Sequence, residues 1–459
     1  MKNCIRFFAL IAIAAGLSLS AVSCCHKDSG YSVPEPCDVV MYQVNPRVFS
    51  PDNSFRAVAS HVDSIKALGA NVVWFMPVCE IGRDGKSKNS PYCVRDYMDV
   101  NPEYGSMDDF KSVIAKCHEK GMCVIMDWVA NHSSWDNRWV AEHPEWYTQD
   151  EEGNIIHPAG TNWEDVADFN FDDPQMRLAM IDAMKFWVED VGIDGFRCDA
   201  ADFVPFDFWK QCLDSLRAIP DHKLLMLAEG GRKDHFDAGF EMNYAWSYMS
   251  VLRAVYGHRG PSTGVPGNGR FGRVTASALF EADAEEYEGI PEGCVKLRFT
   301  TNHDESDKMS PIREFHGERG SMAAFVATVF IHGGPLIYGS QEVAYPGRIN
   351  FFHYVPMDWK SNSNINSEYA SLMALYHEHP ALRKGKVVPY PDDSVLAFGR
   401  VCPEESILIL DNLSQEYIDF TVPIEWAGRR CRDLMTGRTV TLGSTIGIDP
   451  YQYLIYKAE

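Results

Sequence analysis

Residues 122–129 read MCVIMDWV, an almost continuous run of apolar side chains with Asp127 near its end. Similar runs recur along the chain, at VVMYQV (39–44), NVVWFMPV (71–78), GIDGFRCDA (192–200), KLLMLAEG (223–230), FEMNYAW (240–246), VKLRFTTN (295–302) and PLIYG (335–339). Such runs are typical of parallel strands that helices cover on both faces. Eight of them, separated by amphipathic stretches, predict an α/β fold of the TIM (β/α)8 barrel type, with its active site at the carboxyl ends of the strands.

The spacing of these runs predicts three parts in the exported chain. We expect the barrel over residues 38–380, interrupted after its third strand by a subdomain at 133–171 that is rich in tryptophan and charged residues. Beyond Pro380 the pattern changes to short alternating segments separated by Pro, Gly and Asp-Asn turns. This pattern predicts a C-terminal antiparallel β-sandwich over residues 385–459.

The first residues have the composition of an export signal. Lys2 and Arg6 give a positive start, and residues 7–19 form an apolar stretch. This stretch is too short for a stable membrane span, and no later segment is long and apolar enough for one. Residues 1–23 are therefore expected to be a signal peptide that is removed on export.

The end of this signal resembles that of a bacterial lipoprotein. Small residues precede Cys24 in the sequence Ala21-Val22-Ser23-Cys24, and acylation of this cysteine would make it the mature N-terminus. Residues 24–37 would then be a tether, and the protein would be exported and lipid-anchored to a bacterial membrane. Two alternatives stay open: acylation of the adjacent Cys25, and a plain secretory peptide that is cleaved nearby.

Composition restricts the partners of the chain. The formal net charge is −22, whereas nucleic acids and anionic lipids bind clustered Lys and Arg. We therefore expect no nucleic-acid partner, and membrane contact only through the N-terminal lipid. A neutral sugar is compatible with this charge. The thirteen cysteines show no C-x-x-C pair and no zinc spacing, so most are expected to be buried small hydrophobes.

Acidic residues lie at or just past the carboxyl ends of four different strands: Asp127, Asp199, Glu229 and Asp304. Burying an unpaired carboxylate is costly, and gathering several carboxylates raises the pKa of at least one. Glycosidic cleavage needs this combination, because one carboxylic acid protonates the leaving oxygen while one carboxylate attacks. The alternative is that each acid caps a helix or pairs with a nearby arginine. That alternative does not account for four acids at the same end of a barrel.

Four short motifs in this order resemble those of the α-amylase superfamily, glycoside hydrolase family 13. They are DWVANH (127–132), GFRCDA (195–200), LAEG (227–230) and TNHDE (301–305), and the segments at 90–110 and 333–342 also resemble the family. The resemblance implies that Asp199 is the nucleophile and Glu229 the general acid/base. Asp304 would be the third carboxylate, which holds sugar hydroxyls and stabilises the transition state.

The same resemblance assigns residues that contact the sugar at the cleavage point. Tyr92 would stack on it, while His132 and His303 would donate hydrogen bonds to its hydroxyls; each of the three alone would be read as a core residue. Arg197 lies two residues before Asp199, so on a strand both side chains face the same way. Its guanidinium would keep Asp199 ionised, although a purely structural ion pair is the alternative.

Asn131 and Asp168 match positions that often hold a structural Ca²⁺ in this family. Hard oxygen donors suit Ca²⁺, but a simple Asn–Asp hydrogen bond explains the same two residues equally well. No organic cofactor is expected.

The predicted reaction is hydrolysis of α-glucosidic bonds in starch or malto-oligosaccharides by double displacement, with retention. Ala200 follows the nucleophile where members that prefer α-1,6 bonds often have Val, which favours α-1,4 cleavage. Asp202 and Phe203 stand where many α-amylases carry Lys-His. The sequence therefore does not predict how the reducing-end side of the substrate is bound. A transglycosylase and a non-catalytic glucan-binding lipoprotein on the same scaffold are the alternatives.

Overall fold

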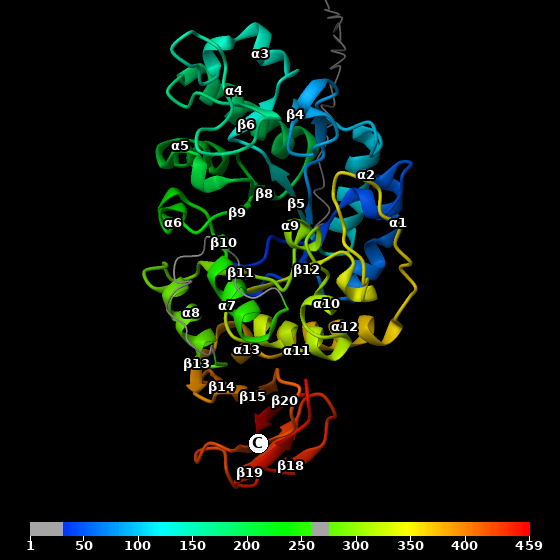
Figure 1. The fold of residues 1–459 in the computed structure, drawn as a ribbon, viewed down its shortest axis with the longest axis vertical. Helices are drawn as coiled ribbons and strands as arrows, with labels where there is room; N and C mark the ends of the chain where they lie inside the picture. Colours follow the sequence, from blue (N-terminus) through cyan, green and yellow to red (C-terminus); the bar gives the residue numbers. More distant parts are fainter. Residues whose placement is uncertain (1–30, 259–274) are drawn as a thin grey trace, which may run out of the picture.

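The computed structural model describes residues 31–258 and 275–459. Eight parallel strands close into a barrel in the order β1-β12-β11-β10-β9-β8-β5-β2 (Figure 1). They are β1 (Met41–Val44), β2 (Val72–Phe75), β5 (Cys123–Trp128), β8 (Gly195–Cys198), β9 (Leu225–Ala228), β10 (Met242–Tyr244), β11 (Val295–Arg298) and β12 (Gly334–Tyr338). Each lies in one of the eight predicted runs, except that β12 begins one residue earlier, and the TIM barrel is confirmed. The predicted signal peptide, Cys24 and residues 25–30 of the tether lie outside the described residues.

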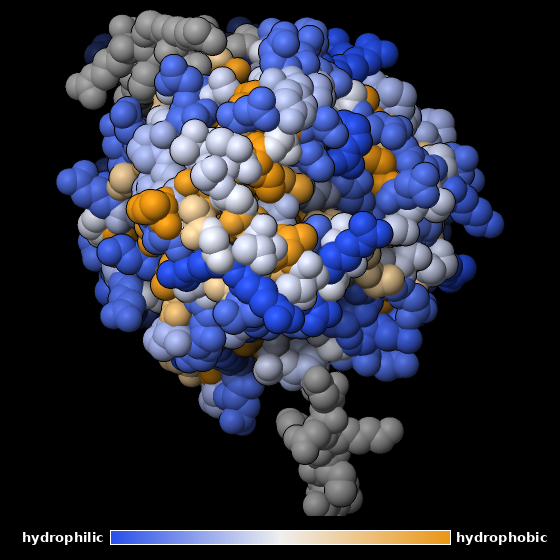
Figure 2. All heavy atoms as spheres, turned by 90° about the horizontal axis from the view of Figure 1, so that it is seen from below, coloured by the Kyte–Doolittle hydropathy of each residue, from blue (hydrophilic) through white to orange (hydrophobic). Residues whose placement is uncertain are grey.

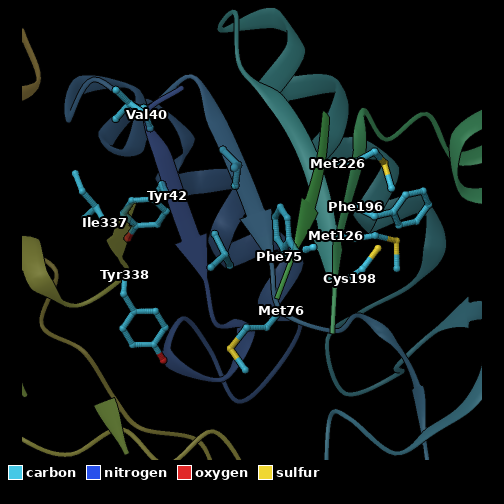
Figure 3. Packing of buried hydrophobic residues seen from close by; sticks show 14 of the residues in the cluster. Val40, Tyr42, Phe75, Met76, Met126, Phe196, Cys198, Met226, Ile337 and Tyr338 are labelled. Carbon is cyan, nitrogen blue, oxygen red and sulfur yellow. The ribbon is translucent and has the colours of Figure 1, made fainter. Parts of the chain in front are cut away.

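The barrel strands bury both of their faces. On β5, Ile125 belongs to the cluster that fills the barrel, whereas Val124 and Met126 belong to the layer between strands and helices. Figure 3 shows part of that outer layer, with Met126, Phe196 and Met226 on neighbouring strands. Because side chains alternate along a strand, two-sided burial gives an unbroken apolar run in the sequence.

A ring of helices covers the outside of the barrel. They are α1 (Ser54–Ala67), α2 (Met107–Glu119), α4 (Pro174–Phe186) with the π-helix η5 (Trp187–Val191), α5 (Phe206–Arg217), α6 (Asp234–Ala238), α7 (Trp246–Tyr256), α8 (Ala278–Tyr287), α10 (Pro311–Glu314), α11 (Glu318–Val329), α12 (Ser363–Glu378) and α13 (Pro380–Lys384). The short helix α9 (His303–Ser306) instead lies at the carboxyl end of the barrel, after β11. Local signals start several of them. Ser106 and Asp109 form a capping box at α2, and the Asp173 side chain caps α4, which begins at Pro174. None of the helices in the described residues is long and apolar enough to cross a membrane.

Two excursions rise from the carboxyl ends of β2 and β5. The first is the hairpin β3 (Cys79–Ile81) and β4 (Val94–Val100), which the sequence did not predict. Its register is irregular. In the second, β6 (His132–Ser134) pairs with β7 (Val166–Asp168), and α3 (Arg138–Glu142) and the 3-10 helix η4 (Pro144–Trp146) lie between them. Aromatic rings join the two excursions, since Tyr97 of β4 stacks on Trp139 of α3 at 5.3 Å.

The C-terminal domain is built from antiparallel sheets, as predicted. A six-stranded sheet has the order β13-β14-β15-β20-β17-β18, and β16 pairs with β19. The strands are β13 (Lys386–Tyr390), β14 (Val395–Val401), β15 (Ser406–Asn412), β16 (Ile418–Thr421), β17 (Arg430–Asp433), β18 (Thr439–Thr441), β19 (Thr445–Ile448) and β20 (Tyr453–Ala458). The sequence did not predict β13, β17 and β19, which are largely exposed and carry few apolar residues in alternation. Seen from this end, the molecule is mostly polar with scattered apolar side chains (Figure 2).

The inner face of this domain packs on the helix layer of the barrel. Ile407 and Ile409 of β15 belong to the same apolar cluster as the helices. Arg400 of β14 is fully buried there, and its guanidinium donates to the carbonyl oxygens of Ala381 and Phe330, at 3.1 and 2.9 Å. Asp411 follows Ile407 and Ile409 on the same face and is also fully buried, so burial raises its pKa well above the usual value.

Asp411→Asn is expected to stabilise the protein at pH 8. The folded state favours the neutral acid, so wild type loses stability as pH rises from the unfolded pKa, about 3.9, through the higher folded value. An amide of the same size has no such cost. The melting temperature, measured by calorimetry, should rise at pH 8 and change little at pH 3.5. Asp419→Asn, on the exposed part of β16, is the control; an equal effect of Asp411→Asn at both pH values would contradict the argument.

Candidate active site

A buried arginine gathers three carboxyl groups inside the carboxyl end of the barrel. Nη1 of Arg197, on β8, lies 2.6 Å from Oδ1 of Asp127 and 2.8 Å from Oδ1 of Asp199. Its Nη2 lies 3.0 Å from Oε1 of Glu229, and its Nε donates to the hydroxyl of Tyr244 at 3.1 Å. The Arg197 side chain is 0 % exposed. Acids that are distant in the sequence therefore share one positive charge.

The order of the strands in the barrel and the alternation of side chains along each strand explain why these carboxyl groups lie together. β5, β8 and β9 are adjacent in the barrel, and Asp127 pairs in register with Arg197. Asp199 lies two residues after Arg197, and Glu229 two residues after Leu227, so both continue the inward-facing positions of their strands. The two expectations from sequence, that Arg197 and Asp199 face the same way and that these acids share a barrel end, are confirmed.

The backbone beside Asp199 is bent to reach Glu229. Ala200 has a left-handed conformation, with φ 45° and ψ 39°, which is uncommon for a residue with a side chain. In this conformation its N–H donates to Oε2 of Glu229 at 2.8 Å. The two oxygens of Glu229 therefore have different partners, the Ala200 amide and the Arg197 guanidinium. Strained backbone of this kind persists where the surrounding structure holds it in place.

The third motif comes from the first turn after β11. Oδ1 of Asn302 accepts the N–H of Asp304 at 3.0 Å and so caps the short helix α9. His303 lies between Gln43, whose Nε2 is 2.7 Å from Nδ1, and Tyr92, whose hydroxyl is 2.5 Å from Nε2. The Asp304 carboxylate lies 3.4 Å from the same Nε2.

These contacts fix the tautomer of His303. Burial lowers its pKa well below the usual value, so the ring is neutral. The Gln43 amide donates to Nδ1, which leaves the proton on Nε2, toward Tyr92. The Tyr92 hydroxyl then donates to Oδ2 of Asp127 at 3.3 Å. A chain of hydrogen bonds thus joins β1, the β3–β4 excursion and β5 behind the site.

The predicted catalytic and sugar-binding residues surround one pocket of about 250 Å³. Its lining consists of Ser90, Tyr92, His132, Trp163, Asp165, Val166, Asp199, Ala200, Glu229, His303, Asp304, Phe351 and Phe352. The three candidate carboxylates and all three candidate sugar contacts are among them, with Arg197 directly behind. The Asp304 side chain is 35 % exposed, against 12 % for Asp199, so Asp304 lies nearer the mouth.

The electrostatics of the pocket give Glu229 a higher pKa than an ordinary carboxylate has. Burial raises the pKa of Glu229 to about 8, and the charges of Asp199 and Asp304 act in the same direction. The Arg197 guanidinium opposes this shift but does not outweigh it. Glu229 can therefore carry a proton at neutral pH, and burial also raises the pKa of Asp127, to about 7.

Several residues of the site were not predicted. Asp127 was noticed as an acid at a strand end but received no role, and Gln43, Tyr244 and Trp163 were not singled out at all. Gln43 and Tyr244 each stand near the carboxyl end of a barrel strand. For Gln43, a polar group between apolar ones was the available signal. Trp163 lies 5.6 Å from His132, ring to ring, and no sequence pattern indicated that contact.

Asn131 and Asp168 lie on adjoining segments outside the pocket. Asp168 pairs with His132 in the β6–β7 ladder, and the carbonyl oxygen of Asn131 accepts the N–H of Phe169 at 3.2 Å. In the part of the chain that the structure describes, no group of three or more His, Cys, Asp or Glu is placed to hold a metal. The pair offers one carboxylate and one amide oxygen, so Ca²⁺ would need backbone carbonyls or water as well. Calcium binding stays a prediction.

Comparison with known proteins gives matches over most of the chain. The model of the α-amylase catalytic domain matches residues 52–384, and that of the maltogenic amylase C-terminal domain matches residues 386–455. An α-amylase of Haloarcula japonica is 27% identical over 425 residues, 87% of this chain and 58% of that protein. An α-1,4-glucan:maltose-1-phosphate maltosyltransferase of Rhodospirillum rubrum is 24% identical over 452 residues, 86% of this chain and 61% of that protein.

The chain thus spans about three fifths of the length of these two relatives. Among solved structures, a maltogenic α-amylase from Thermotoga neapolitana superposes with a TM-score of 0.77 at 24% identity, over 92% of this chain and 99% of that one. At this identity the superposition shows a shared fold.

Arg197→Met is expected to destabilise the fold by about 3–5 kcal/mol, the usual cost of removing one partner from a buried ion pair. The loss should be larger at pH 8 than at pH 5, because the carboxyls left without a partner take up protons at the lower pH. Chemical denaturation at both pH values measures it. Arg56→Met is the control, since Arg56 pairs with Asp109 on the surface and such pairs contribute about 0–1 kcal/mol. Equal losses for the two variants would contradict the central role of Arg197.

Proposed function

The chain belongs to the α-amylase family, and on that premise we propose that it is a retaining glycoside hydrolase of starch, maltodextrins or related α-glucans. One observation carries the proposal most directly. Asp199 and Glu229 contact the same guanidinium, and burial raises the pKa of Glu229 to about 8. An ionised carboxylate beside a protonated one is what cleavage with retention requires.

In the first step Asp199 attacks the anomeric carbon while Glu229 gives its proton to the leaving oxygen. A glycosyl ester forms on Asp199, and the leaving sugar departs with a new hydroxyl group. In the second step Glu229, now ionised, takes a proton from water, whose oxygen displaces Asp199 from the anomeric carbon. The pair is expected to be roughly 5–5.5 Å apart, as in retaining enzymes.

The remaining pocket residues would hold the sugar in place. Asp304, nearer the mouth, would accept hydrogen bonds from two hydroxyls and stabilise positive charge on the ring in the transition state. His132 and His303 would bind further hydroxyls; the neutral His303 ring would release its Nε2–H from Tyr92 to do so. Tyr92 would pack against the ring face.

The bond that is cleaved is proposed to be α-1,4, because Ala200 follows the nucleophile. Transfer to a second sugar instead of water is the near alternative, and the similar Rhodospirillum protein is a maltosyltransferase. A glucan-binding protein without activity is the alternative from another class. The intact set of three carboxylates, Arg197 and both histidines favours the enzyme.

Glu229→Gln tests the enzyme against the binding protein. Wild type should release reducing sugar from amylose or maltotriose, and the variant should lose about 10⁴-fold or more in kcat, as catalytic residues generally do. Product sizes would separate endo from exo action, and longer products would indicate transfer. Pullulan reports on α-1,6 cleavage. If wild type released no more sugar than Glu229→Gln on every substrate, the hydrolase proposal would be abandoned.

We also propose that the exported protein is anchored by a lipid on Cys24. Cys24→Ser should shift the expressed protein from the membrane fraction to the soluble fraction, while the matched variant Cys25→Ser should not. The opposite pattern would assign the lipid to Cys25. Wild-type protein in the soluble fraction, with an N-terminal peptide of unmodified mass, would contradict anchoring.

A structural Ca²⁺ held by Asn131 and Asp168 is proposed to stabilise the contact between β6 and β7. Treatment with a chelator should then lower the melting temperature, and added Ca²⁺ should restore it. In Asp168→Asn the added ion should have little effect. A melting temperature that is indifferent to both chelator and Ca²⁺ in wild type would rule this site out.

A further inference from the structure

A second hollow lies on the surface of the two excursions, away from the catalytic pocket. It has a volume of about 430 Å³ and is lined by Asp84, Gly85, Lys86, Trp135 and Asp136. Gly85 and Lys86 belong to the 3-10 helix η3 (Gly85–Ser87) in the β3–β4 hairpin, and Trp135 follows β6. The hollow is wide open, and Trp135 is its large apolar side chain.

Two hydrogen bonds hold Trp135 in this hollow. Its backbone N–H donates to Oγ of Ser87 at 3.1 Å, and its indole Nε1–H donates to the carbonyl oxygen of Glu164 at 3.0 Å. The indole is only partly buried. With its one polar group already bonded, the ring offers a fixed apolar surface to a ligand.

The segment 163–165 separates this hollow from the catalytic pocket. Trp163 and Asp165 line the pocket, whereas Glu164 between them binds Trp135 through its carbonyl and Lys86 through its carboxylate at 3.0 Å. Ser87 joins the two sides, because its hydroxyl donates to the carbonyl of Asp165 at 2.7 Å. A polymer bound at one hollow would therefore lie close to the other.

We propose that Trp135 is a binding platform for a sugar ring of an α-glucan, separate from the residues that cleave it. The apolar face of a pyranose would pack on the indole, and Asp84 and Lys86 at the rim would bind hydroxyls. Two carboxylates beside the ring and a chain charge of −22 favour a neutral polyol over a polyanion. The choice of glucan as ligand rests on the proposed function.

Binding is measured first, in the Glu229→Gln background, which prevents turnover. Migration in native gels that contain amylopectin should give an affinity about 3–10-fold weaker for Trp135→Ala, the range expected for one lost aromatic contact. Trp135→Phe keeps an aromatic face but lacks the bond to Glu164, so it should retain most of the affinity. Tyr417→Ala removes a more exposed aromatic from the C-terminal domain and should change nothing.

Kinetics of the active enzyme then distinguish a sugar-binding role of Trp135 from a purely structural role. Trp135→Ala should raise KM for amylose by a similar factor, and kcat on amylose and kcat/KM for maltotriose should stay unchanged. Equal losses on maltotriose and amylose, or unchanged binding to amylopectin, would overturn the platform. Absence of hydrolysis by wild type would count against the proposed function alone, since the gel measurement needs no catalysis.

Discussion

The buried guanidinium of Arg197 is the interaction on which the site depends. Asp127, Asp199 and Glu229 come from three strands, and without a shared cation their mutual repulsion and desolvation would oppose the closed barrel end. One positive charge cannot balance three negative ones. Burial relieves this imbalance by raising the pKa of Glu229 to about 8 and that of Asp127 to about 7. The proton that Glu229 then carries is the one that the proposed chemistry needs.

Backbone geometry also positions the groups of the site. The left-handed Ala200 turns its N–H onto Glu229, and the Asn302 cap sets Asp304 at the mouth of the pocket. The bonds from Gln43 and Tyr92 hold His303 as one neutral tautomer. Each of these site residues is thus held in place by hydrogen bonds within the protein. This arrangement limits side-chain motion before any sugar is bound, which is the condition for electrostatic preorganisation.

The sequence predicted the barrel because its strands are buried on both faces and leave unbroken apolar runs. It also predicted the acids at strand ends, since a charge is conspicuous where apolar residues are the rule. It did not predict the β3–β4 hairpin or the exposed strands β13, β17 and β19, whose patterns are irregular. The roles of Gln43 and Tyr244 could not be predicted either, because these roles depend on which residues of other strands the two side chains contact.

The central claim is that Glu229 stays protonated at neutral pH while it shares Arg197 with Asp199. It is tested most directly by carboxyl ¹³C NMR of protein labelled at the glutamate side chains, titrated from pH 4 to pH 10. The signal that is lost in Glu229→Gln identifies the residue. A midpoint near pH 8 is the result that this account predicts. A midpoint near the ordinary glutamate value of about 4.3 would contradict it.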